Sequence, residues 1–396
     1  MKTQINVDQM TGDAMSEEIA ETRRGLHEAR HLPGYIYTSP EIFAEEKERI
    51  FMVDWLCMAR VEEFPNLGDY KTFDVMGDPI AIARGPDGLS AFSNICAHRG
   101  VEVFQGQGNG KSFSCPYHGW TYDLEGKLLG APYMKENQSF DPKVCRLPPL
   151  KLDTWAGFVF VNFNMDAPPL STHVADFAAD FDFLRMGELR LAPAPVRPKS
   201  EGGGRERGRG EQKCNWKLFV ENIVDEYHMA VAHSTTNGRF LTDNSKFTLH
   251  DNGGYMWEYD AGPSTLTGEA LFDPIPWLVD QRERFSISGF LRPNLTLFGR
   301  AANLNAIVTW PVAPDRTRVA GYFLLPEESL ADPEYETKMN SYRETSARTV
   351  AEDTFLISSL QRAMSAKRFT PGYMARQEIG VHHIISHYVE RMFGTA

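Results

Sequence analysis

Two short pairs of metal-binding side chains stand in the first third of the 396-residue chain. Cys96 and His98 form the first pair, and Cys115 and His118 form the second, with sixteen residues between them. Pro116 and several nearby glycines disfavour a helix, so both pairs are expected in loops. Four such ligands could hold a structural zinc ion. Each pair mixes a thiolate with an imidazole, however, and this favours a [2Fe–2S] cluster in which two Cys bind one iron and two His bind the other.

A second pair of histidines, His228 and His233, follows about a hundred residues later. The segment from Trp216 to His233 has a helical pattern. Five residues of an ideal α-helix turn through about 500°, which leaves the two imidazoles about 140° apart. They can bind one metal only if the helix is locally widened, as in a π-bulge, or ends between them. Two polar core histidines that bind no metal are the alternative interpretation.

The two sets of residues, taken together, resemble one known family. After Cys115-Pro-Tyr-His118 the chain continues Gly-Trp-Thr-Tyr-Asp-Leu-Glu-Gly, which resembles the second half of a Rieske motif. The later segment reads Glu-x-x-x-Asp-x-x-His-x-x-x-x-His from Glu221 to His233. This order resembles the terminal oxygenase (α) subunit of Rieske non-haem iron oxygenases. The resemblance spans nearly the whole chain, from Leu-Pro-Gly-Tyr-Ile-Tyr at residue 32 to the C-terminal helices.

The resemblance implies a mononuclear Fe(II) bound by two histidines and one carboxylate, which leaves positions open for O₂. His228 and His233 match the two histidines. Asp353 matches the carboxylate ligand, with the adjacent Glu352 as its competitor and a solvated charge as the non-functional alternative. Asp225 matches an aspartate that lies between the two metal sites and hydrogen-bonds a cluster histidine of one subunit and an iron histidine of its neighbour. Such a carboxylate fixes the tautomer of the imidazole that it contacts.

The same resemblance implies the partners of the chain. Electrons are expected from a separate ferredoxin or reductase, because the chain has no recognisable nicotinamide or flavin module. The glycines at 106, 108 and 110 lie between cluster ligands and lack the strand–turn–helix setting of a dinucleotide site. Transfer of electrons between subunits implies a homotrimer, with a trimer that contains added β subunits as the alternative. A pure Rieske electron carrier and a zinc-stabilised binding protein are less favoured interpretations.

The expected substrates are O₂ and a small organic molecule. The resemblance implies monooxygenation of an aromatic or N-alkyl compound, by hydroxylation or by N- or O-dealkylation, with cis-dihydroxylation of an aromatic ring as the alternative. The pocket wall is expected to draw on apolar residues of the second domain, although each could equally belong to the core. These candidates are Phe240, Leu241, Trp257, Phe285, Ile287, Phe290 and Phe298.

The elements that must position these residues can be read from the pattern of the chain. Short β-rich segments bounded by Gly, Pro or Asp run from about residue 55 to 163 and predict a small antiparallel domain that carries the cluster on two loops. Helices are predicted over residues 39–51, 216–233, 333–364 and 377–393, with strands between 255 and 325. Together with the resemblance, this predicts an α+β fold: a small antiparallel β Rieske domain and a larger, helix-grip-like catalytic domain whose antiparallel sheet is flanked by helices.

Four regions are therefore expected along the chain. Residues 1–54 form an N-terminal helical segment that packs on the catalytic domain, and residues 55–165 form the Rieske domain. Residues 166–212 form a connector, in which the Gly- and Arg-rich stretch is too polar to bury a core and should be mobile. Residues 213–396 form the catalytic iron domain.

Composition excludes several classes of function. A net charge of −12 argues against nucleic acid or an anionic membrane surface as the partner. No apolar run approaches the roughly 18–20 residues of a membrane helix, and the N-terminus lacks the pattern of a signal peptide. Five cysteines are few and odd in number, which disfavours a disulfide framework and predicts a cytoplasmic protein. The histidines at 382, 383 and 387 lie on an amphipathic helix and are expected to be structural.

Overall fold

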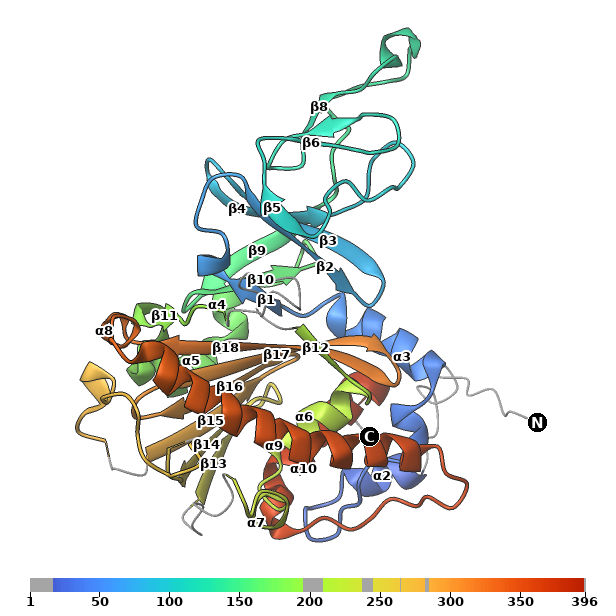
Figure 1. Ribbon diagram of the computed structural model, residues 1–396. Helices are drawn as coiled ribbons and strands as arrows, with labels where there is room; N and C mark the ends of the chain where they lie inside the picture. Colours follow the sequence, from blue (N-terminus) through green and yellow to red (C-terminus); the bar gives the residue numbers. More distant parts are fainter. Residues whose placement is uncertain (1–16, 195–208, 237–244, 264, 282–284, 395–396) are drawn as a thin grey trace. The chain divides into compact units, whose positions relative to one another are not determined.

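The chain folds into two compact units in the computed structural model (Figure 1). The structure describes residues 17–194, 209–236, 245–263, 265–281 and 285–394. The small unit comprises Phe51–His173, and the large unit comprises Met1–Ile50 and Val174–Ala396. In the described ranges, no helix is both long enough and apolar enough to cross a bilayer.

The small unit is built on a seven-stranded sheet in the order β1-β10-β9-β4-β3-β2-β5, in which every neighbouring pair is antiparallel. A second sheet has the order β6-β7-β8. The predicted antiparallel β architecture is confirmed. The strands of the first sheet are β1 (Leu56–Arg60), β2 (Asp69–Val75), β3 (Asp78–Gly85), β4 (Gly88–Ser93), β5 (Gln107–Asn109), β9 (Pro149–Trp155) and β10 (Phe158–Asn162). Those of the second are β6 (Phe113–Ser114), β7 (Thr121–Tyr122) and β8 (Leu128–Gly130).

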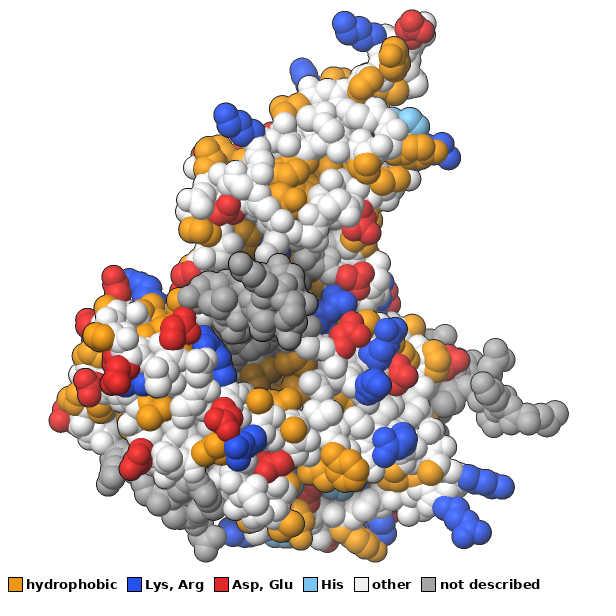
Figure 2. Space-filling model, viewed as in Figure 1, with side chains coloured by type: hydrophobic (Ala, Val, Ile, Leu, Met, Phe, Trp, Pro, Cys, Tyr) orange, Lys and Arg blue, Asp and Glu red, His pale blue; other side chains and the backbone are white. Residues whose placement is uncertain are grey.

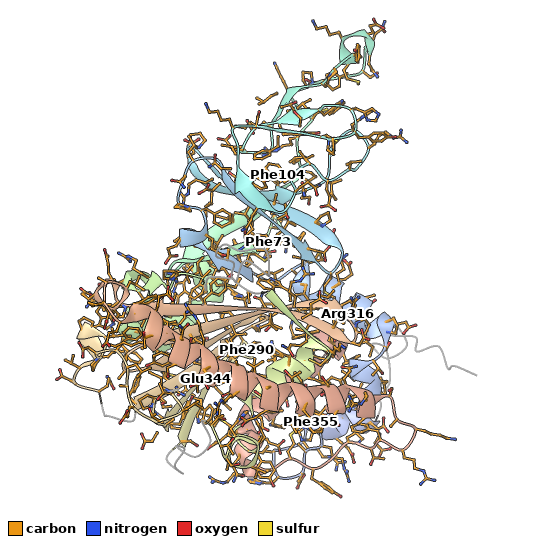
Figure 3. All side chains as sticks on the ribbon, viewed as in Figure 1. Phe73, Phe104, Phe290, Arg316, Glu344 and Phe355 are labelled. Carbon is orange, nitrogen blue, oxygen red and sulfur yellow. The ribbon has the colours of Figure 1, made fainter. Side chains whose placement is uncertain are left out.

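An aromatic core connects the two sheets of the small unit. Phe104, which Figure 3 labels, is fully buried, and its ring centroid lies 5.2 Å from that of Phe92 and 3.9 Å from that of Phe113. The buried side chain of Asn94 accepts hydrogen bonds from the backbone N–H groups of Val103 and Phe104 at 3.0 and 2.8 Å. The loop that follows β4 is therefore fixed to the core by its own backbone.

The large unit contains an eight-stranded antiparallel sheet in the order β11-β18-β17-β16-β15-β14-β13, with β12 also paired to β18. The strands predicted between residues 255 and 325 are confirmed. The strands are β11 (Arg190–Leu191), β12 (Arg209–Gln212), β13 (Ser245–Leu249), β14 (Tyr255–Asp260), β15 (Phe285–Leu291), β16 (Leu295–Arg300), β17 (Leu304–Ala313) and β18 (Arg316–Leu325).

Helices cover both faces of this sheet. Phe323 on β18 lies 5.3 Å, between ring centroids, from Tyr342 on α9 (Tyr335–Met364), and Figure 1 shows α9 crossing the strands. Across β16 and β17, the strand register aligns Ser288 of β15 with Phe323 of β18, so both side chains lie on the face that α9 covers. Side chains alternate along a strand, so Gly289 lies on the opposite face of the sheet. A Cβ on Gly289 would lie only 2.4 Å from Phe181 of α5 (Ala175–Phe181). The sheet is thus enclosed between α9 and α5.

The other helices of the large unit complete this frame. They are α2 (Glu17–Thr22), α3 (Pro40–Glu46), which continues as a π-helix over Lys47–Phe51, α6 (Trp216–Val224), α7 (Met229–Ala232), α8 (Glu327–Leu330) and α10 (Ile379–Phe393). The predictions over residues 39–51, 333–364 and 377–393 are confirmed to within a few residues. Acidic and basic side chains are interspersed on the face of the large unit that Figure 2 shows.

The predicted continuous helix over residues 216–233 is wrong. The helix ends at Val224, and Asp225 has extended backbone angles of −77° and 114°. A separate short helix, α7, begins at Met229. His228 and His233 cap this short helix at its two ends, and the backbone leaves the helical region at His233, with angles of −103° and 23°. Of the two ways in which the histidines could approach each other, the chain therefore uses a helix that ends between them.

The predicted connector over residues 166–212 is also wrong at both of its ends. The second segment of the large unit begins at Val174, inside the predicted connector. Phe177, Phe181 and Leu184 are fully buried in the core of this unit. At the other end, Arg209–Gln212 forms β12, which pairs with β18. Apolar side chains and backbone pairing therefore integrate these parts into the large unit. Residues 195–208, where mobility was predicted, lie outside the described residues.

Candidate metal centres

The two cysteines of the small unit lie in loops with the same backbone hydrogen bonds. In each loop, the cysteine carbonyl accepts from the N–H of a glycine four residues later, Gly100 for Cys96 and Gly119 for Cys115, at 2.9 and 3.0 Å. Each cysteine N–H donates to the carbonyl five residues later. The φ angles of the two glycines are 78° and 73°, which a side chain would strain. The chain thus repeats one tight turn to present two thiols.

The side chains of these loops match an asymmetric cluster. Both thiols are free and buried, whereas His98 and His118 are exposed, with their Nδ1 atoms 3.1 Å apart. Two imidazole nitrogens that face each other at this distance can direct both lone pairs at one metal. The buried hydroxyl of Tyr122 lies 3.3 Å from Cys96 Sγ, so a polar group accompanies the sulfur. The donor set therefore fits a [2Fe–2S] cluster with its His-bound iron towards solvent.

Aromatic rings surround the two imidazoles. The ring of His98 stacks on Trp120 with centroids 5.0 Å apart and an angle of 8° between the planes. The ring of Tyr117 lies 3.8 Å from that of His118, and its hydroxyl accepts a 3.3 Å hydrogen bond from Arg99. Trp120 is buried, whereas Tyr117 is 55% exposed. Of these two aromatic residues, only Tyr117 is accessible to a partner.

A second group of ligand atoms converges in the large unit. The Nε2 atoms of His228 and His233 lie 3.2 Å apart, and Asp353 Oδ1 lies 3.7 and 3.1 Å from them. Asp353 Oδ1 is buried and makes no hydrogen bond, so these short contacts are not aligned as hydrogen bonds. Three lone-pair donors that point at one another in this way fit a metal ion. Within the described ranges, these three residues form the one trio of potential metal ligands.

Each of these ligands is held from behind by another polar group. Asp225 Oδ2 lies 3.0 Å from His228 Nδ1, and Glu352 Oε2 lies 2.8 Å from His233 Nδ1. The carboxylate of Asp353 also receives a hydrogen bond from Asn222 of α6. Glu352, the alternative ligand in the sequence, therefore lies on the Nδ1 side of the imidazole, away from the point where the three ligand atoms meet.

The histidines and carboxylates of this group shift one another's pKa values in opposite directions. Burial alone would raise the pKa of Asp353, but His228 and His233 lower it to about 2. Burial alone would lower the pKa of His228, but the carboxylates of Asp225 and Asp353 raise it to about 9. The carboxylate is thus ionised at neutral pH, whereas a metal must displace the proton that His228 gains from its neighbours.

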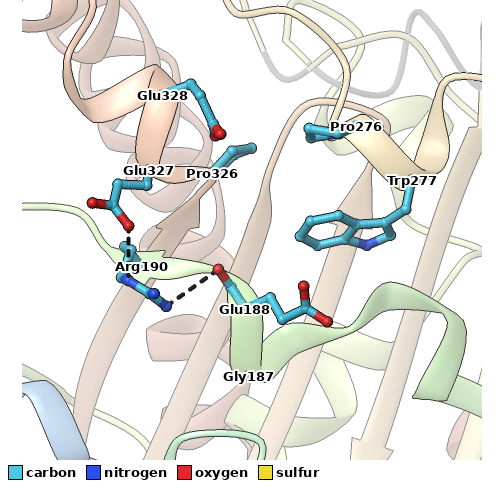
Figure 4. A pocket seen from close by; sticks show the side chains of 8 residues that line it. All are labelled: Gly187, Glu188, Arg190, Pro276, Trp277, Pro326, Glu327 and Glu328. Carbon is cyan, nitrogen blue, oxygen red and sulfur yellow. Dashed lines mark hydrogen bonds and ion pairs between the residues drawn. The ribbon is translucent and has the colours of Figure 1, made fainter.

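The apolar residues that the sequence suggested for a substrate pocket are mainly core. Trp257, Phe285, Ile287 and Phe290 are buried, and Phe298 is partly buried. Phe240 and Leu241 lie outside the described residues. Figure 4 shows a pocket of about 280 Å³ that holds none of the candidate ligands. Its lining consists of Gly187, Glu188, Arg190, Pro276, Trp277, Pro326, Glu327 and Glu328.

Two of the three C-terminal histidines, His382 and His383, contact backbone carbonyls, whereas His387 Nδ1 lies 4.0 Å from Glu390. His382 Nε2 lies 2.8 Å from the carbonyl of Arg24, and His383 Nε2 lies 3.0 Å from two further carbonyls. These contacts agree with the structural role expected for them. No local pattern marks Asn222 as a site residue, because its contact with Asp353 joins residues 131 positions apart.

Two family models match the chain. The model described as "Rieske [2Fe-2S] domain" matches residues 54–146, and the model described as "Ring hydroxylating alpha subunit (catalytic domain)" matches residues 200–394. The first range includes both Cys–His loops, and the second includes the trio of the large unit.

Known proteins resemble the chain over most of its length. The carnitine monooxygenase oxygenase subunit of Acinetobacter pittii (strain PHEA-2) is 30% identical over 347 residues, which are 85% of this chain and 86% of the relative. The chloroplastic choline monooxygenase of Arabidopsis thaliana is 27% identical over 362 residues, which cover 90% of this chain and 82% of the relative. The crystal structure of a quaternary ammonium Rieske monooxygenase in complex with an inhibitor is 26% identical and covers 99% of both chains, with a TM-score of 0.76.

Proposed function

The chain belongs to the Rieske non-haem iron terminal oxygenases, and on this basis we propose that it monooxygenates a small N-alkyl compound, with a quaternary ammonium compound as the first candidate. Members of this family contain a Rieske cluster and a mononuclear iron, receive electrons from a donor protein and consume O₂. When bound, these groups supply one-electron transfer and the activation of O₂. In a monooxygenation, one oxygen atom enters a C–H bond and the other leaves as water, with two electrons and two protons consumed.

The convergence of His228, His233 and Asp353 is the observation on which this proposal rests. We assign these three residues as the iron ligands, because their donor atoms face one another and leave the rest of the coordination sphere to O₂ and water. Asp353 is assigned in preference to Glu352, since its Oδ1 lies near both Nε2 atoms. For the cluster, we assign the ligands as Cys96, His98, Cys115 and His118.

The substrate class is supported by the relatives rather than by a pocket. Two of them are named for carnitine and choline, both of which carry a quaternary nitrogen, and the similar crystal structure is described as a quaternary ammonium monooxygenase. Hydroxylation of a carbon attached to nitrogen gives a product that separates into an amine and a carbonyl compound. The chain would therefore act as a dealkylating or C–N-cleaving enzyme. Cis-dihydroxylation of an aromatic ring is the competing outcome.

A head-to-tail trimer is the assembly that we infer. Asp225 holds His228 Nδ1, and the neighbouring side chains of Tyr227 and Val231 are 57% and 81% exposed. Phe355, which follows Asp353 by two residues on α9 and is labelled in Figure 3, is 71% exposed. Apolar exposure concentrated beside a polar site is typical of a protein interface. The exposed Tyr117 beside His118 offers a second, different surface, and pairing of two different surfaces gives a ring when the rotation between subunits closes.

Metal analysis and oxygen consumption test the proposal. The purified protein should contain three irons per chain and show the visible spectrum of a Rieske cluster, whereas a pure carrier would contain two and a zinc protein would be colourless. With a ferredoxin and reductase pair supplied, O₂ consumption is measured across quaternary ammonium, N-alkyl and aromatic compounds. Labelled O₂ then counts the transferred atoms: one labelled atom in the product supports monooxygenation, and two would overturn it. The cytoplasmic location stays a prediction from the cysteine count.

A further inference from the structure

Glu352 makes an unusually complete set of contacts around the candidate iron site. Its Oε2 lies 2.8 Å from His233 Nδ1 and accepts a 2.7 Å hydrogen bond from the hydroxyl of Thr236. Its Oε1 accepts a 2.9 Å hydrogen bond from the hydroxyl of Thr235. The two hydroxyls donate to different oxygens, so they fix the plane of the carboxylate as well as its position. This leaves Oε2 directed at the imidazole.

The imidazole of His233 is held between two consecutive residues of α9. Asp353 Oδ1 lies 3.1 Å from Nε2, and Glu352 Oε2 lies 2.8 Å from Nδ1. Consecutive residues of an α-helix point about 100° apart, so one helix can reach both edges of a ring that lies across it. The His233 side chain is almost fully buried, which leaves the ring little freedom to turn away.

These contacts determine the chemical state of His233. A carboxylate can only accept a hydrogen bond, so Nδ1 must carry the proton and donate it to Glu352. The lone pair then remains on Nε2, where it faces Asp353 and His228. A carboxylate in this place also makes the imidazole a stronger ligand. We propose that Glu352 is the positioning residue that prepares His233 for the metal, which deepens the proposed function and rests on its iron site.

Asp225 stands in the same relation to His228 but in different surroundings. Its oxygens accept the backbone N–H groups of Tyr227 and His228 at 2.7 and 3.3 Å, and it lies beside the exposed Tyr227. Glu352 is held by the hydroxyls of Thr235 and Thr236 within its own unit. The two carboxylates therefore have different roles in this proposal. Glu352 affects the affinity of the site for the metal, and Asp225 affects electron transfer to the metal.

Metal affinity is the direct test, and it does not depend on turnover. Equilibrium dialysis of Co(II) against the cluster-loaded protein, freed of its mononuclear iron, gives the dissociation constant of the site. Glu352→Ala is expected to weaken binding about 10- to 100-fold. Glu352→Gln is expected to lose less, because its amide oxygen still accepts from Nδ1, although its NH₂ group cannot accept from a threonine. Glu344→Gln, on an exposed part of the same helix, should bind Co(II) like the wild type.

Rescue by iron separates positioning from a general structural effect. The rate of Glu352→Ala should recover towards the wild-type rate as Fe(II) is raised, whereas Asp225→Asn should stay slow at every concentration. An unchanged Co(II) affinity in Glu352→Ala would overturn the proposal, and so would an equal loss in Glu344→Gln. Retention of the Rieske spectrum shows that each variant carries its cluster. If wild-type protein oxidised no substrate while its Co(II) affinity still depended on Glu352, the proposed function would fail and the role of Glu352 would stand.

Discussion

The buried ion pair of Lys217 and Glu46 is expected to dominate the stability of the large unit. Both side chains are buried, at 4% and 0% exposure, and Lys217 Nζ donates directly to Glu46 Oε1. The same carboxylate also accepts from Trp216 Nε1 at 2.8 Å and from the hydroxyl of Tyr388 at 2.7 Å. One carboxylate thus joins α3, α6 and α10, and α6 leads directly into the residues of the candidate iron site.

Lys217→Met removes the positive charge while it preserves most of the apolar stem. Glu46 then keeps two hydrogen bonds but has lost its counter-ion in a buried position. Removal of one partner of a buried pair typically costs about 3–5 kcal/mol, because the other charge is left uncompensated.

Urea unfolding followed by circular dichroism at pH 8 measures this cost. The double variant Glu46→Gln/Lys217→Met removes both charges, and it should recover most of the lost stability. A loss of less than about 1 kcal/mol in Lys217→Met would refute the reasoning, since that is the range of an exposed pair. A double variant no more stable than the single one would show that packing of the lysine stem, rather than charge, carries the effect.

Three further predictions concern the site and its frame. Asp225→Asn should keep both metals but slow oxidation of the reduced cluster about 10- to 100-fold in a single turnover with O₂ and substrate; a wild-type rate would exclude the proposed bridge. Gly289→Ala should cost about 1–3 kcal/mol in urea unfolding, because its Cβ would meet Phe181, whereas Gly321→Ala in open space should be nearly neutral. Burial raises the pKa of Glu221 to about 7, so the folded state holds a proton that the unfolded state releases above about pH 4.5. The wild type should therefore lose stability between about pH 4.5 and 7, by up to about 3 kcal/mol, and Glu221→Gln should not show this loss; parallel pH curves for the two proteins would contradict it.

Local signals in the sequence were sufficient for the strands and for three of the four predicted helices. The mixed Cys–His pairs indicated a particular cluster because ligand chemistry is encoded in adjacent residues. The spacing of His228 and His233 was informative because it conflicts with an intact helix, and the structure resolves the conflict because α7 ends at Ala232, before His233. The long helix α9 was predicted almost to its ends.

Contacts between distant residues could not be read in the same way. The sequence offered Glu352 and Asp353 as competitors, because neighbours on a helix have nearly the same local pattern. Their different orientations are fixed only by the placement of His233, 119 positions away. Phe177 and Phe181 fell within the predicted connector, whereas their burial depends on the small residue Gly289 on a distant strand.

Strands β11 and β12 both pair with β18, and the sequence between them is a candidate position for an inserted domain. Leu191 pairs with Leu324, the N–H of Ala192 still donates to the carbonyl of Phe323, and Arg209 pairs with Ala320. The two pairings thus meet the same edge of β18 about 10 Å apart, three residues of strand rise. Doubling the length of a flexible connection costs only about 0.6 kcal/mol in closure entropy. A small redox module could be spliced in here, so that an engineered oxygenase would carry its own electron supply.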